Sequence, residues 1–441
     1  MNEGQAPIES DRTEPPARRA RDPFRFLTDL VRREGDVARY RAGSEPAFLV
    51  NEPDLIKRVL ADNASNYSKA TAINSAFKRA IADGLLTSEG PLWRRQRRLM
   101  QPAFHRDRLS ALAAQMTEAT LDLMERWEDA ARRGAVLDMT KEMSSLTIRI
   151  TVKALFGTDI VEHVGAVGQR IAESLVMVVS PDKPAMEEAK RMVVGILEDI
   201  MDERLSRPRS TPDLLSMLME ARDEETGESM NRGEILQQMM TLLLAGYETT
   251  ANALGWTWYL LSENEGAGTA LRAELGATLG GRVPTVQDLA LLPYNRMVLE
   301  ESMRLYPPAW ILGRRALVDD RLGDHVIPAG SVVAISPYLM HRHPKHWEDP
   351  ERYDPERFTK ERSVGRKPFA YFPFGGGPRL CIGHNFAMLE AQLIIATVAQ
   401  RYRPRLVPGH SVEPERLFVL RPRGGLPMTL ERAGAVSVSS N

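Results

Sequence analysis

The chain has 441 residues, of which 43% are hydrophobic and 27% are charged, and its formal net charge is −1. This composition is ordinary for a globular protein, and the length allows more than one domain. The balanced charge provides no basic footprint of the kind that nucleic acid requires, so we expect no nucleic acid partner. A single cysteine excludes an internal disulfide and the two-cysteine zinc and redox motifs.

Both ends of the chain are predicted to lack structure. Residues 1–22 contain proline and arginine clusters without an apolar run, which predicts a disordered leader and neither a signal peptide nor a membrane anchor. Residues 433–441 are expected to form a flexible tail, and residues 23–432 a single domain. No stretch approaches the ~18 consecutive apolar residues of a spanning helix. Together with the lone cysteine, this favours a cytoplasmic location.

The first structured elements alternate between helix and strand. Residues 24–33 have the apolar spacing of a helix, and residues 37–41 and 47–50 are typical of strands. The turn after them caps a helix at 54–61. Residues 68–90 mix small, charged and apolar side chains without a clear period, which predicts a mobile loop.

A strongly basic helix is predicted at 91–100, with proline at its first position. Trp93 and Arg97 are four residues apart and share one face, whereas the other three arginines of the helix point elsewhere. A solvated basic helix has this pattern. An equally open interpretation is that Arg97 and the Trp93 indole N–H bind a buried anion.

Helical periodicity continues from 107 to 203 and is interrupted at three breaks, residues 132–134, 156–157 and 180–184. The last break separates apolar helices at 167–179 and 185–205. A proline-marked pair of this kind is typical of a lid, although an ordinary connection has the same pattern. A further helix is predicted at 213–221.

The longest predicted helix covers 231–264, begins at the capping residue Asn231, and is apolar nearly all round, so it should be central and buried. Its middle, residues 245–250, reads Ala-Gly-Tyr-Glu-Thr-Thr. An unpaired carboxylate in a buried helix is costly, and threonine hydroxyls can bond back to carbonyls and open the helix locally. We therefore predict a groove with a proton-bearing pair, Glu248 and Thr249.

Beyond this helix the chain changes from helices to short strands. Helices are predicted at 268–279 and 289–305, and Glu301 and Arg304 of the second can pair on one face. Short strands are predicted at 310–317, 325–327, 331–335, 405–407, 417–419 and 428–430, with a turn at 321–324. The histidine-rich segment 341–346 contains proline and basic residues, which favours a solvated turn over a metal site.

The cysteine, Cys381, follows three successive glycines and a proline and precedes a helix predicted at 382–401. The amides of such a turn and the N-terminal end of a helix both favour a thiolate. Haem iron accepts an axial cysteine thiolate. A glycine-rich turn with a buried, inert cysteine remains the alternative on this stretch alone.

In their order along the chain, these motifs resemble those of the cytochromes P-450, haem-thiolate monooxygenases, over residues 23–432. The family's haem signature, Phe-x-x-Gly-x-Arg-x-Cys-x-Gly, is matched by Phe374, Gly377, Arg379, Cys381 and Gly383. The family's Glu-x-x-Arg pair matches Glu301 and Arg304, and the third arginine of that group matches Arg357. The family's oxygen groove matches residues 245–250. Its Trp-x-x-x-Arg motif matches Trp93 and Arg97, and a further arginine that binds a haem propionate in the family matches Arg314.

The resemblance implies a mainly α fold with a minor β lobe and a long central helix over haem b. Cys381 would be the axial ligand of the iron, in a cofactor site that includes the other signature residues. Two haem propionates would be bound by Trp93, Arg97, Arg314 and Arg379. The group of Glu301, Arg304 and Arg357 would be a structural clamp on the cysteine loop, and Glu248 and Thr249 would be the catalytic proton carriers.

The implied reaction inserts one oxygen atom of O2 into a small apolar substrate by hydroxylation or epoxidation. A fatty acid, a terpenoid or a polyketide would fit. Without a flavin or iron–sulfur motif, electrons from NAD(P)H should arrive through a separate ferredoxin- or flavodoxin-type partner, for which Arg94, Arg95 and Arg98 are candidate contacts. We expect a monomer. The expected pocket walls are Leu242, Ala245, Ala309, Trp310, Ile311, Leu312 and Phe418.

Two other readings remain open. A haem-thiolate peroxygenase or isomerase would use peroxide in place of O2, and a sensor or carrier would catalyse nothing. Relatives of the first kind usually lack the distal acid and threonine, and a sensor has no use for a proton relay. Because Glu248 and Thr249 are both present, the sequence favours the monooxygenase.

Overall fold

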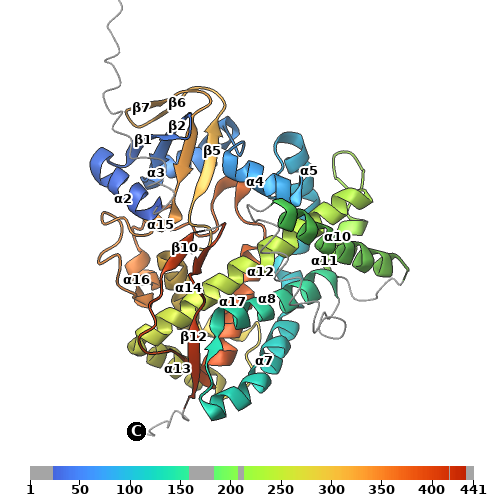
Figure 1. Ribbon diagram of the computed structural model, residues 1–441, viewed down its shortest axis with the longest axis vertical. Helices are drawn as coiled ribbons and strands as arrows, with labels where there is room; N and C mark the ends of the chain where they lie inside the picture. Colours follow the sequence, from blue (N-terminus) through green and yellow to red (C-terminus); the bar gives the residue numbers. More distant parts are fainter. Residues whose placement is uncertain (1–22, 158–182, 207–212, 417, 434–441) are drawn as a thin grey trace, which may run out of the picture.

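The computed structural model describes residues 23–157, 183–206, 213–416 and 418–433. The predicted leader at 1–22, the first helix of the predicted lid at 167–179, and all but one residue of the predicted tail lie outside these ranges. Helices make up most of the described chain. The five-stranded sheet and the pair of β6 (Asp320–Leu322) and β7 (His325–Ile327) lie together in a smaller lobe, while β10 (Pro414–Arg416) and β12 (Pro427–Arg432) lie among the helices (Figure 1).

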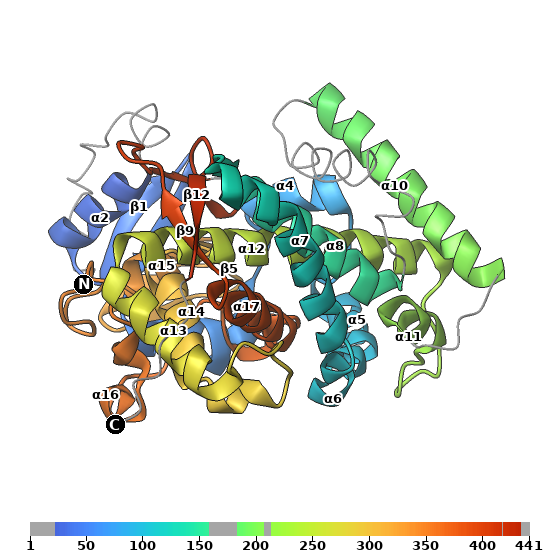
Figure 2. The same cartoon turned by 90° about the horizontal axis from the view of Figure 1, so that it is seen from below.

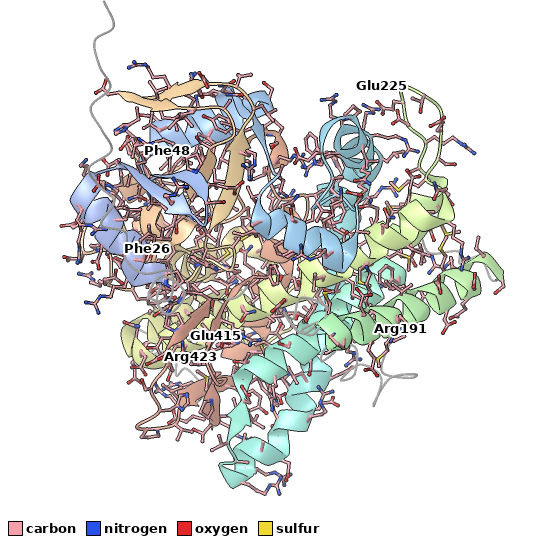
Figure 3. All side chains as sticks on the ribbon, turned by 45° about the horizontal axis from the view of Figure 1, so that its top comes forward. Phe26, Phe48, Arg191, Glu225, Glu415 and Arg423 are labelled. Atoms are coloured by element: carbon pink, nitrogen blue, oxygen red, sulfur yellow. The ribbon has the colours of Figure 1, made fainter. Side chains whose placement is uncertain are left out.

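The lobe is built on a five-stranded sheet. The strand order is β1 (Val37–Ala42), β2 (Glu45–Val50), β8 (Val332–Ile335), β5 (Leu312–Ala316) and β3 (Tyr67–Ser68). Strands β2 and β8 are parallel, and the other neighbours are antiparallel. Helix α2 (Pro23–Glu34) buries Phe24, Leu27 and Leu30, which share one helical face, against this lobe. Figure 3 shows Phe48 on β2 and Phe26 on α2.

Helix α12 (Arg232–Glu263) crosses the middle of the molecule (Figures 1 and 2). Its first turn is closed by a reciprocal cap: the Glu234 amide donates to Asn231 Oδ1 at 3.0 Å, and the Asn231 amide donates to Glu234 Oε2 at 2.9 Å. It contacts α8 (Met139–Phe156), α10 (Lys183–Ser206), α11 (Leu214–Glu220), α13 (Glu265–Leu279), α14 (Pro293–Leu305) and α17 (His384–Ala399). The predicted central buried helix is thus confirmed.

The other helices complete the body. These are α3 (Pro53–Lys57), α4 (Ala72–Ile81), α5 (Gly90–Met100), α6 (Arg106–Ser110), α7 (Ala113–Arg133), α15 (Pro337–Met340) and α16 (Lys360–Ser363). Helix α7 packs across α8 and α17. It ends at Gly134 and α8 ends at Gly157, both at φ 61° in the left-handed conformation that glycine adopts at low cost. The predicted helix breaks at 132–134 and 156–157 therefore coincide with the C-terminal ends of α7 and α8.

The remaining strands in the described part of the chain form three smaller sheets. They are β4 (Leu137–Asp138), β12 (Pro427–Arg432) and β9 (Tyr402–Leu406) in one sheet, β6 (Asp320–Leu322) with β7 (His325–Ile327), and β10 (Pro414–Arg416) with β11 (Leu420–Pro422). Among the described residues, none of the helices combines the length and apolar character needed to cross a bilayer.

Several local predictions were wrong. The predicted mobile loop at 68–90 contains α4, whose N-terminus is capped by Thr71 Oγ1, which accepts from the Asn74 amide at 3.3 Å. Of the predicted strand at 417–419, residue 417 lies outside the described residues, and residues 418–419 lie between the paired strands β10 and β11 and are not themselves paired. The predicted turn at 321–324 includes the end of β6, and the predicted helix at 54–61 gives way to a π-helical turn after Lys57.

Candidate active site

Cys381 lies in the loop before α17, which begins three residues later than the cysteine, at His384. The Cys381 amide donates to the Phe374 carbonyl at 3.0 Å and so closes the loop. Burial raises the pKa of the thiol, while a hydrogen bond from the Gly383 amide and the charge of Arg97 lower it. The glycine turn before the cysteine was predicted to bond the sulfur; the amide found there belongs to Gly383, on the helix side.

The Cys381 side chain is both accessible and closely surrounded by protein. It retains accessible surface, yet desolvation by the neighbouring protein raises the pKa of its thiol. A thiol in that position can bind a group that reaches it.

Two glycines of the turn are required by packing. Gly377 has φ +66°, and a Cβ there would lie 1.9 Å from the Leu60 carbonyl oxygen. A Cβ at Gly376 would lie 2.3 Å from the Phe369 ring. The backbone of the cysteine loop therefore approaches the turn after α3 so closely that no side chain fits between them.

Four cations gather beside the cysteine loop: Lys69, Arg97, Arg314 and Arg379. Arg97 donates to the Leu380 carbonyl at 2.8 Å. Arg379 donates to Glu89 Oε1 at 2.9 Å, and its guanidinium lies 4.0 Å from the centroid of the Trp93 ring. The structure thus brings together Trp93 and the three predicted arginines.

These cations are poorly compensated. Burial lowers the pKa of Arg379 to about 10, and burial together with the charges of Arg314 and Arg379 lowers the pKa of Lys69 to about 7. Arg314 is only 8% exposed. Glu89 is the one carboxylate that acts on this group of cations among the described residues. The excess of buried positive charge suits a ligand with several negative charges.

Lys69 escaped the sequence analysis. It lies in the segment predicted to be a loop, next to β3, and a single lysine there carries no recognisable signal. In the structure its amide donates to Glu89 Oε1 at 3.1 Å, and its ammonium group bonds to the Leu86 carbonyl. Only the fold reveals that this lysine shares Glu89 with Arg379.

The predicted clamp is present and fully buried. Glu301 accepts two hydrogen bonds from Arg304, at 2.6 and 2.8 Å, and one from the Asp354 amide at 2.8 Å. Arg357 Nε lies 3.4 Å from Glu301 Oε1. Arg304 also donates to the carbonyls of His341, Pro350 and Arg352, at 2.9, 2.7 and 3.0 Å. The clamp therefore fixes the irregular segment 341–357.

The clamp reaches the cysteine loop through His341. The His341 ring is completely buried and accepts a hydrogen bond from the Phe372 amide at 2.9 Å, two residues before Phe374. Burial and the neighbouring arginines lower the pKa of this imidazole, so it stays neutral. Because His341 and His343 are both buried, the prediction of a solvated turn was wrong. Among the described residues, no cluster of metal-ligating side chains forms here or elsewhere.

The middle of α12 carries the predicted acid and threonine. Thr249 Oγ1 donates to the Ala245 carbonyl at 2.9 Å, as predicted for a back-bonded hydroxyl. Burial raises the pKa of Glu248, and the charge of Arg421 on β11 partly opposes this. The helix is α-helical throughout 232–263, so the predicted local opening is absent. A Cβ at Gly246 would lie 3.2 Å from Thr151 on α8, so this glycine permits close helix packing.

The predicted pocket residues divide into different environments. Leu242 packs with Ile81 and Leu85 in one apolar cluster. Leu312 borders the cysteine loop, since its side chain would lie 3.9 Å from a Cβ at Gly375. The Trp310 ring packs edge-on against Phe24, with 5.2 Å between centroids, and belongs to the core of the β lobe with Ile311. The Phe418 ring meets the Phe77 ring of α4 at 4.1 Å.

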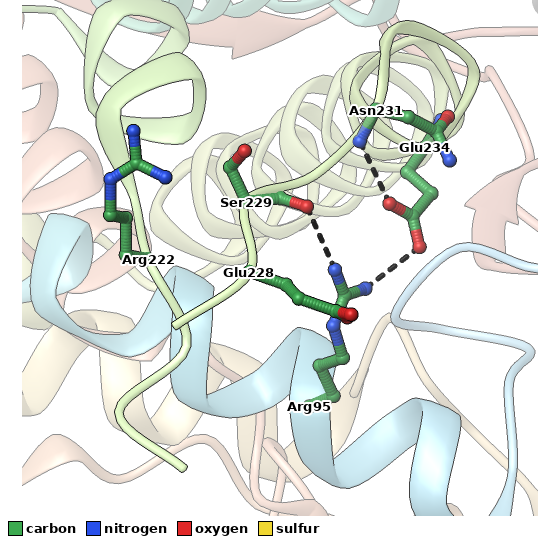
Figure 4. Close-up of a pocket in the computed structure, with 6 residues that line it drawn as sticks. All are labelled: Arg95, Arg222, Glu228, Ser229, Asn231 and Glu234. Atoms are coloured by element: carbon green, nitrogen blue, oxygen red, sulfur yellow. Dashed lines mark hydrogen bonds and ion pairs between the residues drawn. The ribbon is translucent and has the colours of Figure 1, made fainter. Parts of the chain in front are cut away.

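A separate polar groove of about 600 Å³ lies at the start of α12 (Figure 4). Its lining residues are Arg95, Arg222, Glu228, Ser229, Asn231 and Glu234. Arg95 donates to Glu234 at 2.7 Å and to the Ser229 carbonyl at 2.9 Å. Arg98 is likewise bonded to Asp223 and Glu225, and Figure 3 places Glu225 at the outer end of this turn. Of the three arginines predicted to meet a redox partner, Arg94 alone is classed as exposed.

Comparisons with known proteins agree with this architecture. The cytochrome P-450 family model matches residues 16–427. Cyclooctatin synthase of Streptomyces melanosporofaciens is 38% identical over 411 residues, which cover 90% of this chain and 88% of the relative. Cyclooctat-9-en-7-ol 5-monooxygenase of the same organism is 34% identical, with 93% and 91% covered. The crystal structure of a cytochrome P-450, CYP102L1, superposes with a TM-score of 0.86 at 25% identity and covers 93% of this chain and 94% of its own.

The family match covers nearly the whole chain, the relatives align over most of their length, and the fold is shared with solved members. The chain belongs to the cytochrome P-450 family and is a monooxygenase that uses haem iron and O2.

Proposed function

We propose that this enzyme hydroxylates a cyclic terpenoid and binds haem b through Cys381 and the four cations Lys69, Arg97, Arg314 and Arg379. The observation that carries the cofactor assignment is the charge of the site. Lys69, Arg314 and Arg379 share one carboxylate, Glu89, and Arg97 interacts with the Cys381 thiolate. Three positive charges are left over, and two propionates with one thiolate would balance them.

Each group has a separate task in this proposal. Cys381 Sγ would bind the haem iron, and the Gly383 amide and Arg97 would stabilise its negative charge. The arginines, Lys69 and the Trp93 indole would bind the propionates. The clamp of Glu301, Arg304 and Arg357 would hold the cysteine loop through His341. When bound, the haem supplies the activation of O2, with one oxygen atom entering the substrate and the other leaving as water.

Glu248 and Thr249 would manage the protons that the reaction consumes. Because burial raises the pKa of Glu248, its carboxyl holds a proton closer to neutral pH than an exposed glutamate does. The Thr249 hydroxyl is bonded to the Ala245 carbonyl one turn earlier, and rotation about its Cα–Cβ bond would redirect it. A carboxyl that holds a proton and a hydroxyl that passes it on form a two-step relay.

The choice of substrate rests on the relatives and on the apolar side chains near the site. One relative is named for oxidising carbon 5 of cyclooctat-9-en-7-ol, a cyclic alkene with one hydroxyl. Among the three predicted classes, a terpenoid is nearest to that description. Leu242, Leu312 and the ring pair of Phe77 and Phe418 offer apolar contacts to such a molecule.

Electrons would come from NAD(P)H through a separate ferredoxin- or flavodoxin-type protein. Arg94 is the exposed cation of α5 that remains available for an acidic partner. The enzyme would act as a monomer.

The proposal is tested by spectroscopy on the haem-loaded protein. The reduced carbon monoxide complex should show the red-shifted band of a thiolate ligand, and Cys381→Ser should abolish it. Cyclic terpenoid alcohols should displace the iron-bound water and shift the spin state at micromolar concentration, whereas straight-chain fatty acids of equal carbon number should not. A shift with the fatty acids alone would overturn the substrate class, and a thiolate band in Cys381→Ser would overturn the ligand assignment.

A further inference from the structure

Glu390 is a buried carboxyl group that the proposed mechanism does not use. It lies on α17, is 0% exposed, and sits among the apolar side chains of the main core. Neither of its carboxyl oxygens meets a hydrogen-bond donor at normal geometry within the part of the chain that the structure describes. An acid in such a place needs either a counter-charge or a proton.

The polar side chain that reaches this carboxyl belongs to Thr250 on α12. Thr250 is 3% exposed, and its Oγ1 donates to the Gly246 carbonyl at 3.3 Å. Helices α12 and α17 are in direct contact. Thr250 thus stands between the buried acid and the turn of α12 that carries Glu248 and Thr249.

The direction of the hydrogen bonds follows from the Thr250 geometry. A hydroxyl has one hydrogen, and that hydrogen is used toward the Gly246 carbonyl. Thr250 Oγ1 can then only accept from Glu390, and a carboxylate has nothing to donate. A protonated carboxyl does, so a chain from Glu390 to Thr250 to Gly246 is satisfied only when the acid is neutral.

We propose that Glu390 is a neutral positioning residue, whose carboxyl O–H donates to Thr250 Oγ1 and thereby fixes the turn of α12 that carries Glu248 and Thr249. The chain locks the Thr250 hydroxyl on the Gly246 carbonyl, next to the carbonyl of Ala245 that Thr249 uses. Because the hydroxyls of Thr249 and Thr250 each bond to a fixed carbonyl of the preceding turn, the position of Thr249 along α12 is fixed as well.

Desolvation supports the neutral state. Burial raises the pKa of Glu390 well above its ordinary value. A hydrogen bond donated by Thr250 would lower this pKa, but the Thr250 hydroxyl is directed at the Gly246 carbonyl, so burial favours the protonated carboxyl. The effect of Glu390 on the reaction rests on the proposed function, in which α12 carries the proton relay. The protonation state of Glu390 can be measured without any substrate.

The first test is infrared difference spectroscopy on the haem-loaded enzyme at pH 7. Subtracting Glu390→Gln from the wild type should reveal the C=O stretch of a protonated carboxyl, unchanged between pH 6 and 9. Thr250→Val should shift this band to higher frequency, because the hydroxyl oxygen that accepts the bond is gone. Glu263→Gln, at the exposed end of α12, is the control and should leave the band in place. A carboxylate band for Glu390, or a band that Thr250→Val leaves unmoved, would overturn the proposal.

The second test measures how electrons are divided between product and hydrogen peroxide. Glu390→Leu keeps the bulk but removes the donor, so the peroxide fraction should rise several-fold, whereas Glu390→Gln retains a donor and should stay near the wild type. If Glu390 acts through Thr250, adding Thr250→Val to Glu390→Leu should cause no further rise in the fraction of electrons that forms peroxide. Equal losses in the Gln and Leu variants, or additive losses in the double variant, would refute a positioning role. If Glu390→Leu fails to fold, the infrared bands of Glu390→Gln and Thr250→Val still decide the question.

Discussion

Replacement of Glu301 by Gln tests the clamp at the point where its charges meet. The carboxylate accepts three hydrogen bonds, two from Arg304 and one from the Asp354 amide, and it is the nearest counter-charge to Arg357. Gln keeps one acceptor oxygen but turns an NH2 group toward a guanidinium. The change leaves the buried Arg304 without its carboxylate partner and Arg357 with Asp354 as its remaining counter-charge.

The size of the effect follows from burial. Glu301 and Arg304 are both 0% exposed, and removing one partner of a buried ion pair costs about 3–5 kcal/mol. Since the whole free energy of unfolding of a domain is roughly 5–15 kcal/mol, the variant should lose a large share of it. The adjacent Glu300 pairs with Arg296, whose side chain is 62% exposed. Glu300→Gln, the matched control, should therefore change the free energy of unfolding by at most about 1 kcal/mol.

The assay is urea unfolding of both variants and the wild type, followed by far-ultraviolet circular dichroism, together with the molar ratio of haem to protein after purification. Glu301→Gln should unfold at a much lower urea concentration and retain less haem, because the segment 341–357 and the His341 bond to Phe372 lose their anchor. A free energy of unfolding within about 1 kcal/mol of the wild type would refute the reasoning.

Three further outcomes are expected. Gly377→Ala should abolish haem retention, since the new Cβ would lie 1.9 Å from the Leu60 carbonyl oxygen. The control Gly266→Ala, whose Cβ would have no atom within 4 Å, should retain haem. Equal haem content in the two variants would contradict this packing argument. Because the pKa of Lys69 is lowered to about 7, this side chain gains its proton as the pH falls through 7. Haem release should therefore slow about tenfold between pH 8 and pH 6, equal to ~1.4 kcal/mol, and Lys69→Met should remove that dependence when release is followed by transfer to a haem-free acceptor protein. Thr249→Ala should bind haem normally but divert electrons to peroxide, and unchanged coupling of electrons to product would exclude the relay.

The features that were predictable from sequence are local. The reciprocal cap of Asn231 and Glu234 and the helix ends at Gly134 and Gly157 depend on a few neighbouring residues. Spacing alone also placed Glu301 and Arg304 on one face. The family and its fold were also predictable, because the family's sequence motifs occur in order along the chain.

The features that were missed depend on partners distant in the chain. Lys69 acquires its role from Glu89 and Arg379, and the Arg95 and Arg98 charges are used by residues more than a hundred positions away. Gly376 and Gly377 looked like an anion-binding turn but are required by Phe369 and Leu60. A glycine in an anion-binding turn and a glycine required by close packing look the same in a sequence. Only the neighbouring atoms in the structure distinguish the two.

The excess of cations beside the cysteine loop has a consequence for how the enzyme matures. With Glu89 as their one carboxylate partner, Lys69, Arg314 and Arg379 repel one another, so we expect the segment that includes α4 and Glu89 to be held less firmly before haem binds than after it. We expect haem binding to complete the ordering of this segment. Cells short of iron should accumulate chains that proteases cut between residues 68 and 90, and supply of haem should protect that segment.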